Sequence, residues 1–331
     1  MAHKFIKKKI AVIFTGGTIS MTVNKEINAA TPTLTSSDIM DLVHHIKDFA
    51  DVDLIDFSAL PGPHMTPQMM MKLKKTVEEH CLREEIAGVV VTHGTDNLEE
   101  IAYLLDLTLA TSKPVVMTGS MRNASELGYD GPSNLASAIL TAISEESVKR
   151  GVLVVLNDEI NAAREVTKTH TMSLDTFKSL EFGPLGIVDS NTVVYYRNQN
   201  FGRKHIDTET IEDNVALIKM ASGMDARIFD FWVEDGVKGI VIEGMGRGNV
   251  PFGVMPGVKR AISAGIPIVL VSRNPLGRTM PSYGYAGGGL DLVNTGVIFA
   301  RNLNGQKARI ALMLALSKGD DIGKIRSYFE G

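Results

Sequence analysis

The stretch from Ile10 to Thr18 reads IAVIFTGGT, and it is the clearest local indication of how this chain folds. Its first five residues are apolar without interruption, which predicts a strand that is buried on both faces of a sheet. The turn that follows contains Gly16 and Gly17, whose conformational freedom lets the backbone turn tightly beside a bound molecule. We therefore expect a first buried strand that ends in a candidate ligand-binding turn.

The same pattern of a short apolar run followed by a turn recurs along the chain. Such runs are at residues 89–92, 115–118, 152–156, 240–243 and 268–271. Helical patterns alternate with them, at residues 69–80, 101–111, 132–144 and 305–317. This alternation predicts βαβ units with right-handed crossovers, and therefore a doubly wound parallel sheet with helices on both faces.

Two of these helices have recognisable start signals. Thr66 is the expected N-cap of the first helix, with Pro67 in the first helical position. Asp96 and Glu99 have the spacing of a capping box before the second helix. This second signal predicts a helix N-terminus, with its partial positive charge, directly after Thr95.

A length of 331 residues suggests two domains. The chain becomes polar over residues 197–214, and a fresh strand–helix alternation begins after it. We predict an N-terminal α/β domain over residues 1–196, a linker over residues 197–214, and a smaller C-terminal α/β domain over residues 215–331.

The composition excludes several classes of protein. Hydrophobic residues make up 44% and charged residues 22% of the sequence, which argues against intrinsic disorder. The formal net charge is −4, so we expect neither nucleic acid nor a membrane surface as a partner. Cys81 is the only cysteine, which excludes an intrachain disulfide and a cysteine-based zinc or iron–sulfur site.

The basic start of the chain, from Lys4 to Lys9, precedes the apolar residues 10–14. This order resembles a signal peptide, but the apolar run falls short of the roughly 7–15 residues that such a segment needs. No stretch approaches the roughly 18 apolar residues of a membrane span. We therefore predict a cytoplasmic protein.

The familiar cofactor motifs fail. The turn over residues 15–18 is no phosphate-binding loop, because no Lys-Ser or Lys-Thr pair follows a second glycine at the required distance. Gly244 and Gly246 fit the start of a dinucleotide-binding GxGxxG motif, but Asn249 occupies the position of its third glycine. The histidines show no metal-ligand spacing. We therefore expect no metal and no organic cofactor.

The turns over residues 15–18 and 93–96 place polar side chains where a ligand would bind. Ligands of doubly wound sheets bind outside the carboxyl ends of the strands, and a helix N-terminus after Thr95 would favour an anion. Structural interpretations stand beside this one: Thr15 and Thr18 as turn residues, Asp96 as a helix cap, and His93 as a packed histidine. The residues alone therefore predict a ligand site with threonines.

These two turns resemble the signature motifs of the bacterial-type L-asparaginase family. The resemblance continues in order along almost the whole chain, through KPVVMTGSMR at residues 113–122, DGPSN at 130–134, REVTKT at 164–169 and QKAR at 306–309. It implies a flavodoxin-like N-terminal domain and the hydrolysis of L-asparagine to L-aspartate and ammonia, without a metal or cofactor.

The resemblance implies catalytic roles for Thr15, Thr95, Asp96 and Lys168. Thr15 matches the family's nucleophilic threonine, whose hydroxyl needs a neighbour to take its proton. Lys168 would be that base if it is largely removed from water. Asp96 would orient the lysine or bind the α-ammonium group, and backbone N–H groups at Gly94 and Thr95 would stabilise an oxyanion. Which threonine attacks first stays open.

The resemblance implies substrate-binding residues less directly. Ser120 matches the small residue that receives the side-chain amide. Gly62, Pro63 and His64 stand where many members carry polar side chains for the substrate's α-carboxylate. Because this chain departs from that pattern, we expect backbone donors, His64 or Ser58 to substitute.

A second departure concerns the loop over residues 20–35, which in the family carries a tyrosine that helps to activate the nucleophile. No tyrosine is present there in this chain, so we expect Tyr283, Tyr285 or Lys168 to take that role. The loop has few anchoring side chains, and we still expect it to close over substrate.

The resemblance also implies a homotetramer of two intimate dimers, with each active site at a dimer interface and completed by a neighbour's C-terminal domain. Ser222 and residues 283–289 stand near where family members supply polar groups to that neighbouring site. The glycines 287–289 are expected to allow close backbone approach.

Three other functions stay open. A dual glutaminase–asparaginase is the nearest, because one methylene typically discriminates by only about 1–3 kcal/mol. A subunit of the tRNA-dependent amidotransferase would need extra N-terminal structure and a basic face. A non-catalytic amino-acid sensor would not need the complete set of Thr15, Thr95, Asp96 and Lys168.

Overall fold

The computed structural model describes residues 7–199 and 202–330, so Lys4 of the basic start and Asn200 of the predicted linker lie outside the described residues. The chain divides into two compact units, Met1–His205 and Ile206–Gly331, each with its own sheet and hydrophobic core. This division falls inside the polar stretch of residues 197–214.

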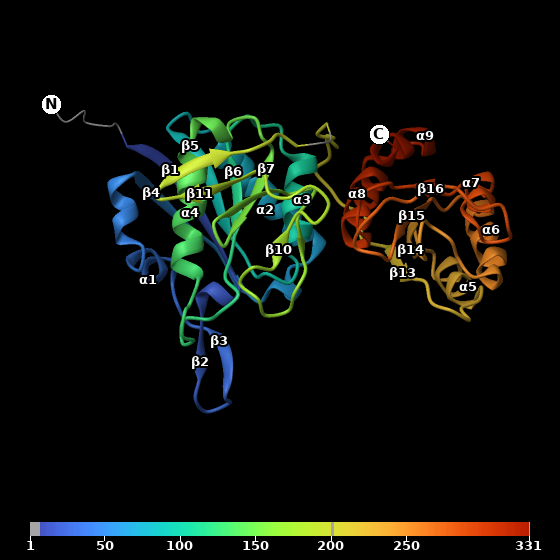
Figure 1. The fold of residues 1–331 in the computed structure, drawn as a ribbon, viewed down its shortest axis with the longest axis horizontal. Helices are drawn as coiled ribbons and strands as arrows, with labels where there is room; N and C mark the ends of the chain where they lie inside the picture. The colour runs from blue at the N-terminus through green and yellow to red at the C-terminus, as the bar shows by residue number, and fades with distance from the viewer. Residues whose placement is uncertain (1–6, 200–201, 331) are drawn as a thin grey trace. The chain divides into compact units, whose positions relative to one another are not determined.

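An eight-stranded sheet forms the centre of the first unit (Figure 1). Its strands are β1 (Lys8–Gly16), β4 (Ala50–Leu60), β5 (Ile86–Thr92), β6 (Val115–Thr118), β7 (Val152–Leu156), β8 (Glu159–Ala162), β11 (Gly186–Asp189) and β12 (Thr192–Tyr195). The strands β4-β1-β5-β6-β7 are neighbours in that order and run parallel. Numbered along the chain, this is the 2-1-3-4-5 order of flavodoxin-like sheets. The other three strands extend the β7 edge by antiparallel pairing. The predicted fold class is confirmed.

Helices cover both faces of this sheet. They are α1 (Ser36–Asp41), α2 (Pro67–Leu82), α3 (Leu98–Thr108) and α4 (Gly131–Ile143). Apolar side chains of α1 and α4 share one cluster with alternate strand residues such as Val12 and Val90. The helices α2 and α3 contact β5, β6 and β7 from outside that cluster. The central strands are therefore buried on both faces, which is why residues 10–14 are continuously apolar.

The two predicted helix starts differ in outcome. Thr66 is the N-cap of α2 and accepts a hydrogen bond from the Met69 amide at 3.3 Å, with Pro67 at the first position, so this prediction is confirmed. The helix α3 begins only at Leu98, and Asn97 occupies its N-cap without a side-chain capping bond. The predicted capping box is wrong, because its two carboxylates have other partners in the candidate site.

Residues 20–35 form a β-hairpin over much of their length. Its strands are β2 (Met21–Asn24) and β3 (Ala29–Pro32), and it follows the short 3-10 turn η1 (Thr18–Ser20). The β6–α4 loop anchors the hairpin base, because the Ala124 amide donates to Met21 O and Ser125 Oγ accepts from the Val23 amide, both at 3.0 Å. The same loop reaches η1, where Tyr129 Oη donates to Ile19 O at 2.5 Å.

The second unit is a smaller α/β structure. Its strands β13 (Val215–Lys219), β14 (Gly239–Gly244), β15 (Ile268–Ser272) and β16 (Ile298–Phe299) form a parallel sheet in chain order. Its helices are α5 (Arg227–Glu234), α6 (Met255–Ser263), α7 (Gly289–Thr295), α8 (Gly305–Lys318) and α9 (Ile322–Phe329). Phe229 of α5 and Val258 of α6 pack in one cluster with Ile242 of β14. The side chain of Leu312 in α8 packs closely over Gly239.

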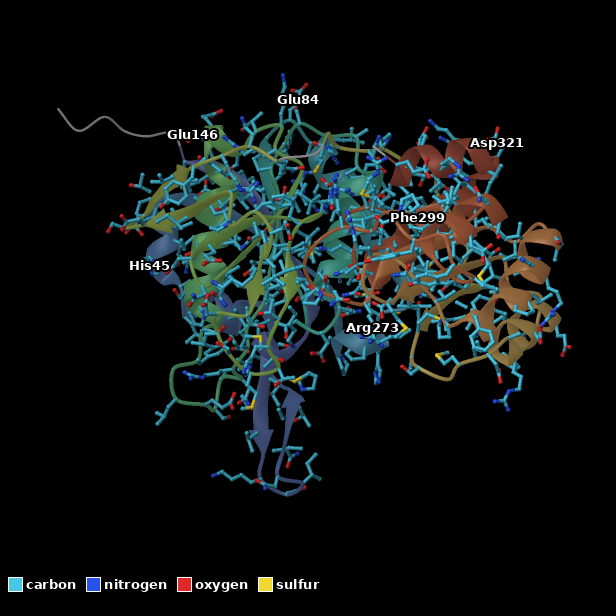
Figure 2. All side chains as sticks on the ribbon, turned by 45° about the vertical axis from the view of Figure 1, so that its right-hand side comes forward. His45, Glu84, Glu146, Arg273, Phe299 and Asp321 are labelled. Carbon is cyan, nitrogen blue, oxygen red and sulfur yellow. The ribbon has the colours of Figure 1, made fainter. Side chains whose placement is uncertain are left out.

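Charged side chains such as Glu84, Glu146 and Asp321 are exposed and extend from the surface into solvent (Figure 2). In the part of the chain that the structure describes, no helix is long and apolar enough to cross a membrane.

Candidate active site

The strand order of the first unit reverses between β1 and β5. Connections that leave these neighbouring strands pass to opposite faces of the sheet, which opens a crevice at their carboxyl ends. The strand β1 ends in the turn with Gly16 and Gly17, and β5 ends at Thr92, directly before His93. Both sequence-predicted turns therefore lie at the edge of the sheet where a ligand is expected.

Glycines bring these two turns and the turn after β4 into backbone contact. A Cβ atom on Gly17 would lie 2.4 Å from the amide nitrogen of Gly94, and one on Gly94 would lie 2.9 Å from the amide nitrogen of Gly62. Gly17 also has a φ of 85°, in the region that favours glycine. Gly62 and Gly94, both predicted to bind substrate, thus pack the turns after β4 and β5 against the turn after β1.

Lys168 connects the two polar residues that follow Gly94. Its Nζ donates to Thr95 Oγ1 at 3.0 Å and to Asp96 Oδ1 at 2.7 Å. The lysine side chain is 15% exposed, the Asp96 side chain is 65% exposed and Thr95 is buried. An amine largely removed from water therefore joins a buried hydroxyl to a carboxylate that is open to solvent.

Glu99 holds the strand that carries this lysine. Lys168 belongs to β9 (Thr167–Lys168), which pairs with β10 (Phe177–Lys178). The buried Glu99 carboxylate accepts from Thr167 Oγ1 at 2.9 Å and from the Lys168 amide at 3.3 Å. These bonds and the Asp96–Lys168 pair explain why the two acids do not cap α3. The sequence analysis missed Glu99 as a supporting residue; its only signal was an acid beside the apolar side chains of a predicted helix.

Thr15 has no exposed surface in the structure. Its Oγ1 lies 2.5 Å from His93 Nδ1 and 2.9 Å from Thr92 O. A nucleophile must reach its substrate, so complete burial argues against the predicted attack by Thr15. The contacts that Thr15 makes instead join the end of β1 to the end of β5.

His93 and Asn97 continue this buried connection. Asn97 Nδ2 donates to Gly62 O at 2.9 Å, so Asn97 Oδ1 faces His93 Nε2, which lies 3.0 Å away. His93 Nε2 must then carry the proton of the neutral ring, and the lone pair on Nδ1 faces the Thr15 hydroxyl, whose single proton is shared between Nδ1 and Thr92 O. Burial lowers the pKa of His93 to about 4, although the bond to Asn97 opposes the shift. The neutral imidazole is thus a structural link, as one of the sequence interpretations expected.

Thr18 is the second threonine of the β1 turn, and its side chain is half-buried. It directly follows Gly17, whose α carbon packs against the Gly94 backbone beside Thr95. Of the two threonines in the turn, only Thr18 has exposed surface. The sequence analysis treated Thr18 as a turn residue, although the two glycines before it were a signal that its hydroxyl could be presented to a ligand.

The other predicted substrate residues have mixed environments. Ser120 is buried and donates to Arg122 O at 2.7 Å. Ser58 donates to Thr15 O at 2.7 Å. Pro63 and His64 are exposed in the 3-10 turn η3 (Gly62–His64). Substrate contacts by Ser120, Pro63 and His64 stay predictions.

The residues predicted to act in a neighbour's site belong to the second unit. Ser222 is exposed, and so are Tyr283 and Tyr285, whose ring centroids lie 5.7 Å apart. A Cβ atom on Gly287 would lie 2.4 Å from Val250 O, so the expected close backbone approach at these glycines is confirmed. Their contribution to a neighbouring site stays a prediction.

A hollow of about 270 Å³ lies beside the Lys168 cluster. It is lined by Asp96, Lys168, Thr169, His170 and Thr171. It adjoins the crevice between β1 and β5, because Lys168 bonds to Thr95 directly after β5. This hollow is the candidate active site.

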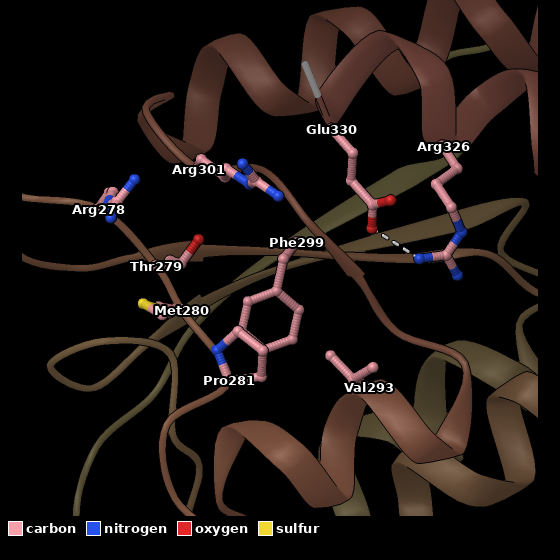
Figure 3. Close-up of a pocket in the computed structure, with 9 residues that line it drawn as sticks. All are labelled: Arg278, Thr279, Met280, Pro281, Val293, Phe299, Arg301, Arg326 and Glu330. Carbon is pink, nitrogen blue, oxygen red and sulfur yellow. Dashed lines mark hydrogen bonds and ion pairs between the residues drawn. The ribbon is translucent and has the colours of Figure 1, made fainter.

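The second unit has a larger hollow, of about 490 Å³, in which three arginines surround Phe299 (Figure 3). One of them, Arg326 of α9, pairs with Glu330 at the end of the same helix. Its lining contains no amine–hydroxyl pair of the kind that Lys168 and Thr95 form. Within residues 7–199 and 202–330, no three His, Cys, Asp or Glu side chains are grouped so that they could hold a metal ion.

Two family models match consecutive parts of the chain. The model described as "Asparaginase, N-terminal" matches residues 9–201, and the model described as "Glutaminase/Asparaginase C-terminal domain" matches residues 214–329. Together they cover the crevice, the Lys168 cluster and the second unit.

Individual proteins match over almost the full chain. L-asparaginase 2 of Bacillus subtilis (strain 168) is 37% identical, over 97% of this chain and 85% of that protein. L-asparaginase 2 of Escherichia coli (strain K12) is 34% identical, over 97% of this chain and 92% of that protein. The crystal structure of a probable cytoplasmic L-asparaginase from Campylobacter jejuni has a TM-score of 0.88 and 33% identity, and covers 98% of this chain and 99% of that one.

Proposed function

The chain belongs to the asparaginase family, and from this premise we propose that it hydrolyses L-asparagine to L-aspartate and ammonia. The observation that carries the proposal is the bonding of Lys168 Nζ to both Thr95 Oγ1 and Asp96 Oδ1 at the ligand edge of the sheet. An amine that touches a hydroxyl in a largely buried site is suited to move a proton to or from that hydroxyl.

The first step is attack on the side-chain amide carbon by a threonine hydroxyl. We assign this attack to Thr18 in place of Thr15, because the Thr15 hydroxyl is buried and bonded to His93. The hydroxyl proton passes to the leaving nitrogen through Lys168 and Thr95, the carbon–nitrogen bond breaks, and ammonia leaves. A β-aspartyl ester on the threonine remains.

The second step is hydrolysis of this ester. Water adds to the ester carbon, the bond to the threonine oxygen breaks, and the proton from the water returns to that oxygen. We assign the orientation of this water to Thr95, whose hydroxyl bonds to Lys168 Nζ at 3.0 Å. Backbone N–H groups at Gly94 and Thr95 remain our candidates for stabilising the negative oxygen in both steps.

The exposed Asp96 carboxylate supplies the contact for the α-ammonium group of the substrate. It is 65% exposed and still bonded to Lys168, so it presents negative charge to the hollow without being withdrawn from water. A zwitterionic amino acid of the size of asparagine or glutamine suits a hollow of about 270 Å³.

The decisive experiment measures ammonia release from L-asparagine and L-glutamine by the wild type and by Thr95→Ala. We expect release from asparagine that the variant reduces by at least a hundredfold. Equal kcat/KM values on the two amides would replace this proposal with a dual glutaminase–asparaginase. Aspartate binding in calorimetry without any ammonia release would establish the sensor.

We also propose a cytoplasmic location and a homotetramer in which neighbours complete one another's sites. The probable cytoplasmic assignment of the Campylobacter jejuni structure supports the first, while a relative from Haemophilus influenzae described as periplasmic points the other way. Light scattering on the purified protein tests the second, and a monomer that retains full activity would contradict it.

A further inference from the structure

His170 lines the candidate active site, but neither the resemblance nor the proposed reaction gives it a role. It shares the wall of the 270 Å³ hollow with Asp96 and Lys168. It is exposed, so its imidazole can be reached from solvent. Its chemistry depends on which of its two ring nitrogens carries the proton.

The backbone fixes the His170 tautomer. Nδ1 accepts hydrogen bonds from the Met172 amide and the Ser173 amide, both at 3.0 Å. An amide N–H can only donate, so Nδ1 must offer its lone pair and the proton of the neutral ring must be on Nε2. In the part of the chain that the structure describes, Nε2 itself forms no hydrogen bond. His170 therefore has one unused N–H donor.

Hydrogen bonds between Thr176 and the His170 backbone hold the loop around His170 in place. Thr176 is completely buried, its Oγ1 donates to His170 O at 2.7 Å, and it accepts from the His170 amide at 2.7 Å. The Thr169 hydroxyl donates to Thr176 O at 2.8 Å. The loop over residues 169–176 lies between the paired strands β9 and β10, so both of its ends are fixed. The donor is thus on a constrained loop, which reduces the entropy that ligand binding would otherwise cost.

We propose that His170 Nε2–H is a substrate-binding donor that bonds to the α-carboxylate of the amino acid in the hollow. This inference rests on the proposed function. The α-ammonium and α-carboxylate groups share one carbon atom, so a substrate whose ammonium meets Asp96 has its carboxylate within a few ångströms of the same place. His170 is on the wall of that hollow and offers a neutral donor where an anion must be held. It supplies a side-chain donor for the carboxylate in addition to those expected from the segment Gly62–His64.

Two variants separate this role from a purely structural one. His170→Asn keeps an acceptor close to the position of Nδ1 and so preserves the bonds from Met172 and Ser173, but it cannot reach as far as Nε2. His170→Gln places an amide N–H₂ close to the position of Nε2 but loses the acceptor for the Met172 and Ser173 amides. We expect KM for L-asparagine to rise about tenfold in His170→Asn, with kcat within twofold and an unchanged melting temperature.

In His170→Gln we expect a lower melting temperature together with a KM closer to that of the wild type. The opposite pattern, an unchanged KM in His170→Asn and a raised KM in His170→Gln, would overturn the inference. It would show that His170 only stabilises its own turn. Calorimetric affinity for L-aspartate, measured on the same variants, should weaken in parallel with KM. If wild-type protein releases no ammonia, the proposed function fails; if it does and His170→Asn binds aspartate normally, only the role of His170 fails.

Discussion

Lys168 Nζ lies 3.0 Å from Thr95 Oγ1, although the two residues are 73 positions apart in the chain. The contact exists because Glu99, at the start of α3, bonds both Thr167 Oγ1 and the Lys168 amide and so fixes the short strand β9 beside the end of β5. A residue in the first turn of α3 therefore positions the lysine of the pair, and Thr95 precedes the same helix in the turn after β5.

The first prediction concerns loss of the Lys168 amine. Lys168→Met keeps the length of the side chain and removes its two hydrogen bonds, so we expect kcat for ammonia release to fall by about 10²–10⁴-fold. Lys178→Met is the matched control, because Lys178 is on the partner strand β10 and is also ion-paired, with Glu159 and Asp175. The control should lose stability but keep kcat within a few-fold. Equal losses of kcat in the two variants would contradict a catalytic role for Lys168.

The second prediction separates the two threonines of the β1 turn. Thr18→Val should reduce kcat by at least a thousandfold and leave the free energy of unfolding nearly unchanged, because Thr18 is only partly buried and we assign its hydroxyl to the reaction. Thr15→Val should lower that free energy by about 1–3 kcal/mol, because His93 Nδ1 is left buried without a donor, and keep kcat within about tenfold. Urea unfolding and steady-state kinetics on both variants measure these two effects. A large loss of kcat in Thr15→Val with a normal kcat in Thr18→Val would restore Thr15 as the nucleophile.

The third prediction follows from the pKa of His93, which burial lowers from 6.5 to about 4. Between these two values the unfolded imidazole takes up a proton and the folded one does not, so the native state loses stability as the pH falls. Above about pH 6.5, His93 is neutral in both states and does not change the free energy of unfolding. Below about pH 4 the loss of stability reaches its full size. The expected size is about 3 kcal/mol.

Urea unfolding at several pH values measures this loss. Carboxylates titrate in the same window, so the comparison is with His93→Gln, which has no titratable group at this position. The wild-type curve should fall more steeply than that of the variant between pH 6.5 and pH 4. Parallel curves would show that the ring is not held neutral by its surroundings.

The fourth prediction tests the close approach of the turns. Gly17→Ala would place a Cβ atom 2.4 Å from the Gly94 amide nitrogen in a residue whose φ is 85°. Gly236→Ala is the matched control, because Gly236 has a similar φ of 77° and no atom within 4 Å of such a Cβ. The control should lose about 1 kcal/mol of stability from its backbone conformation alone. Gly17→Ala should lose at least about 3 kcal/mol and most of its activity. Similar losses in thermal unfolding would mean that the turns do not need this contact.

Much of the fold could be predicted because its signals are local. Residues 10–14 are continuously apolar because a central parallel strand is covered on both faces, and Thr66 caps α2 because it is immediately before the free amides of that helix. The strand order, which puts β1 next to β5 and so creates the crevice, depends on long-range pairing that no local pattern records.

The fold class and the two turns at which the site lies could be predicted from the sequence, because apolar periodicity and glycine are sufficient to specify a buried strand and a tight turn. The role of each polar side chain there depends on its neighbours in the folded chain. Thr15 and Thr18 are equivalent hydroxyls in the sequence, and burial against His93 removes the first from solvent. Asp96 and Glu99 have the spacing of a helix cap, but both carboxylates bond to residues of β9 instead. Polar groups bond to whatever folding brings within about 3 Å of them, and that neighbourhood is set by the packing of distant segments.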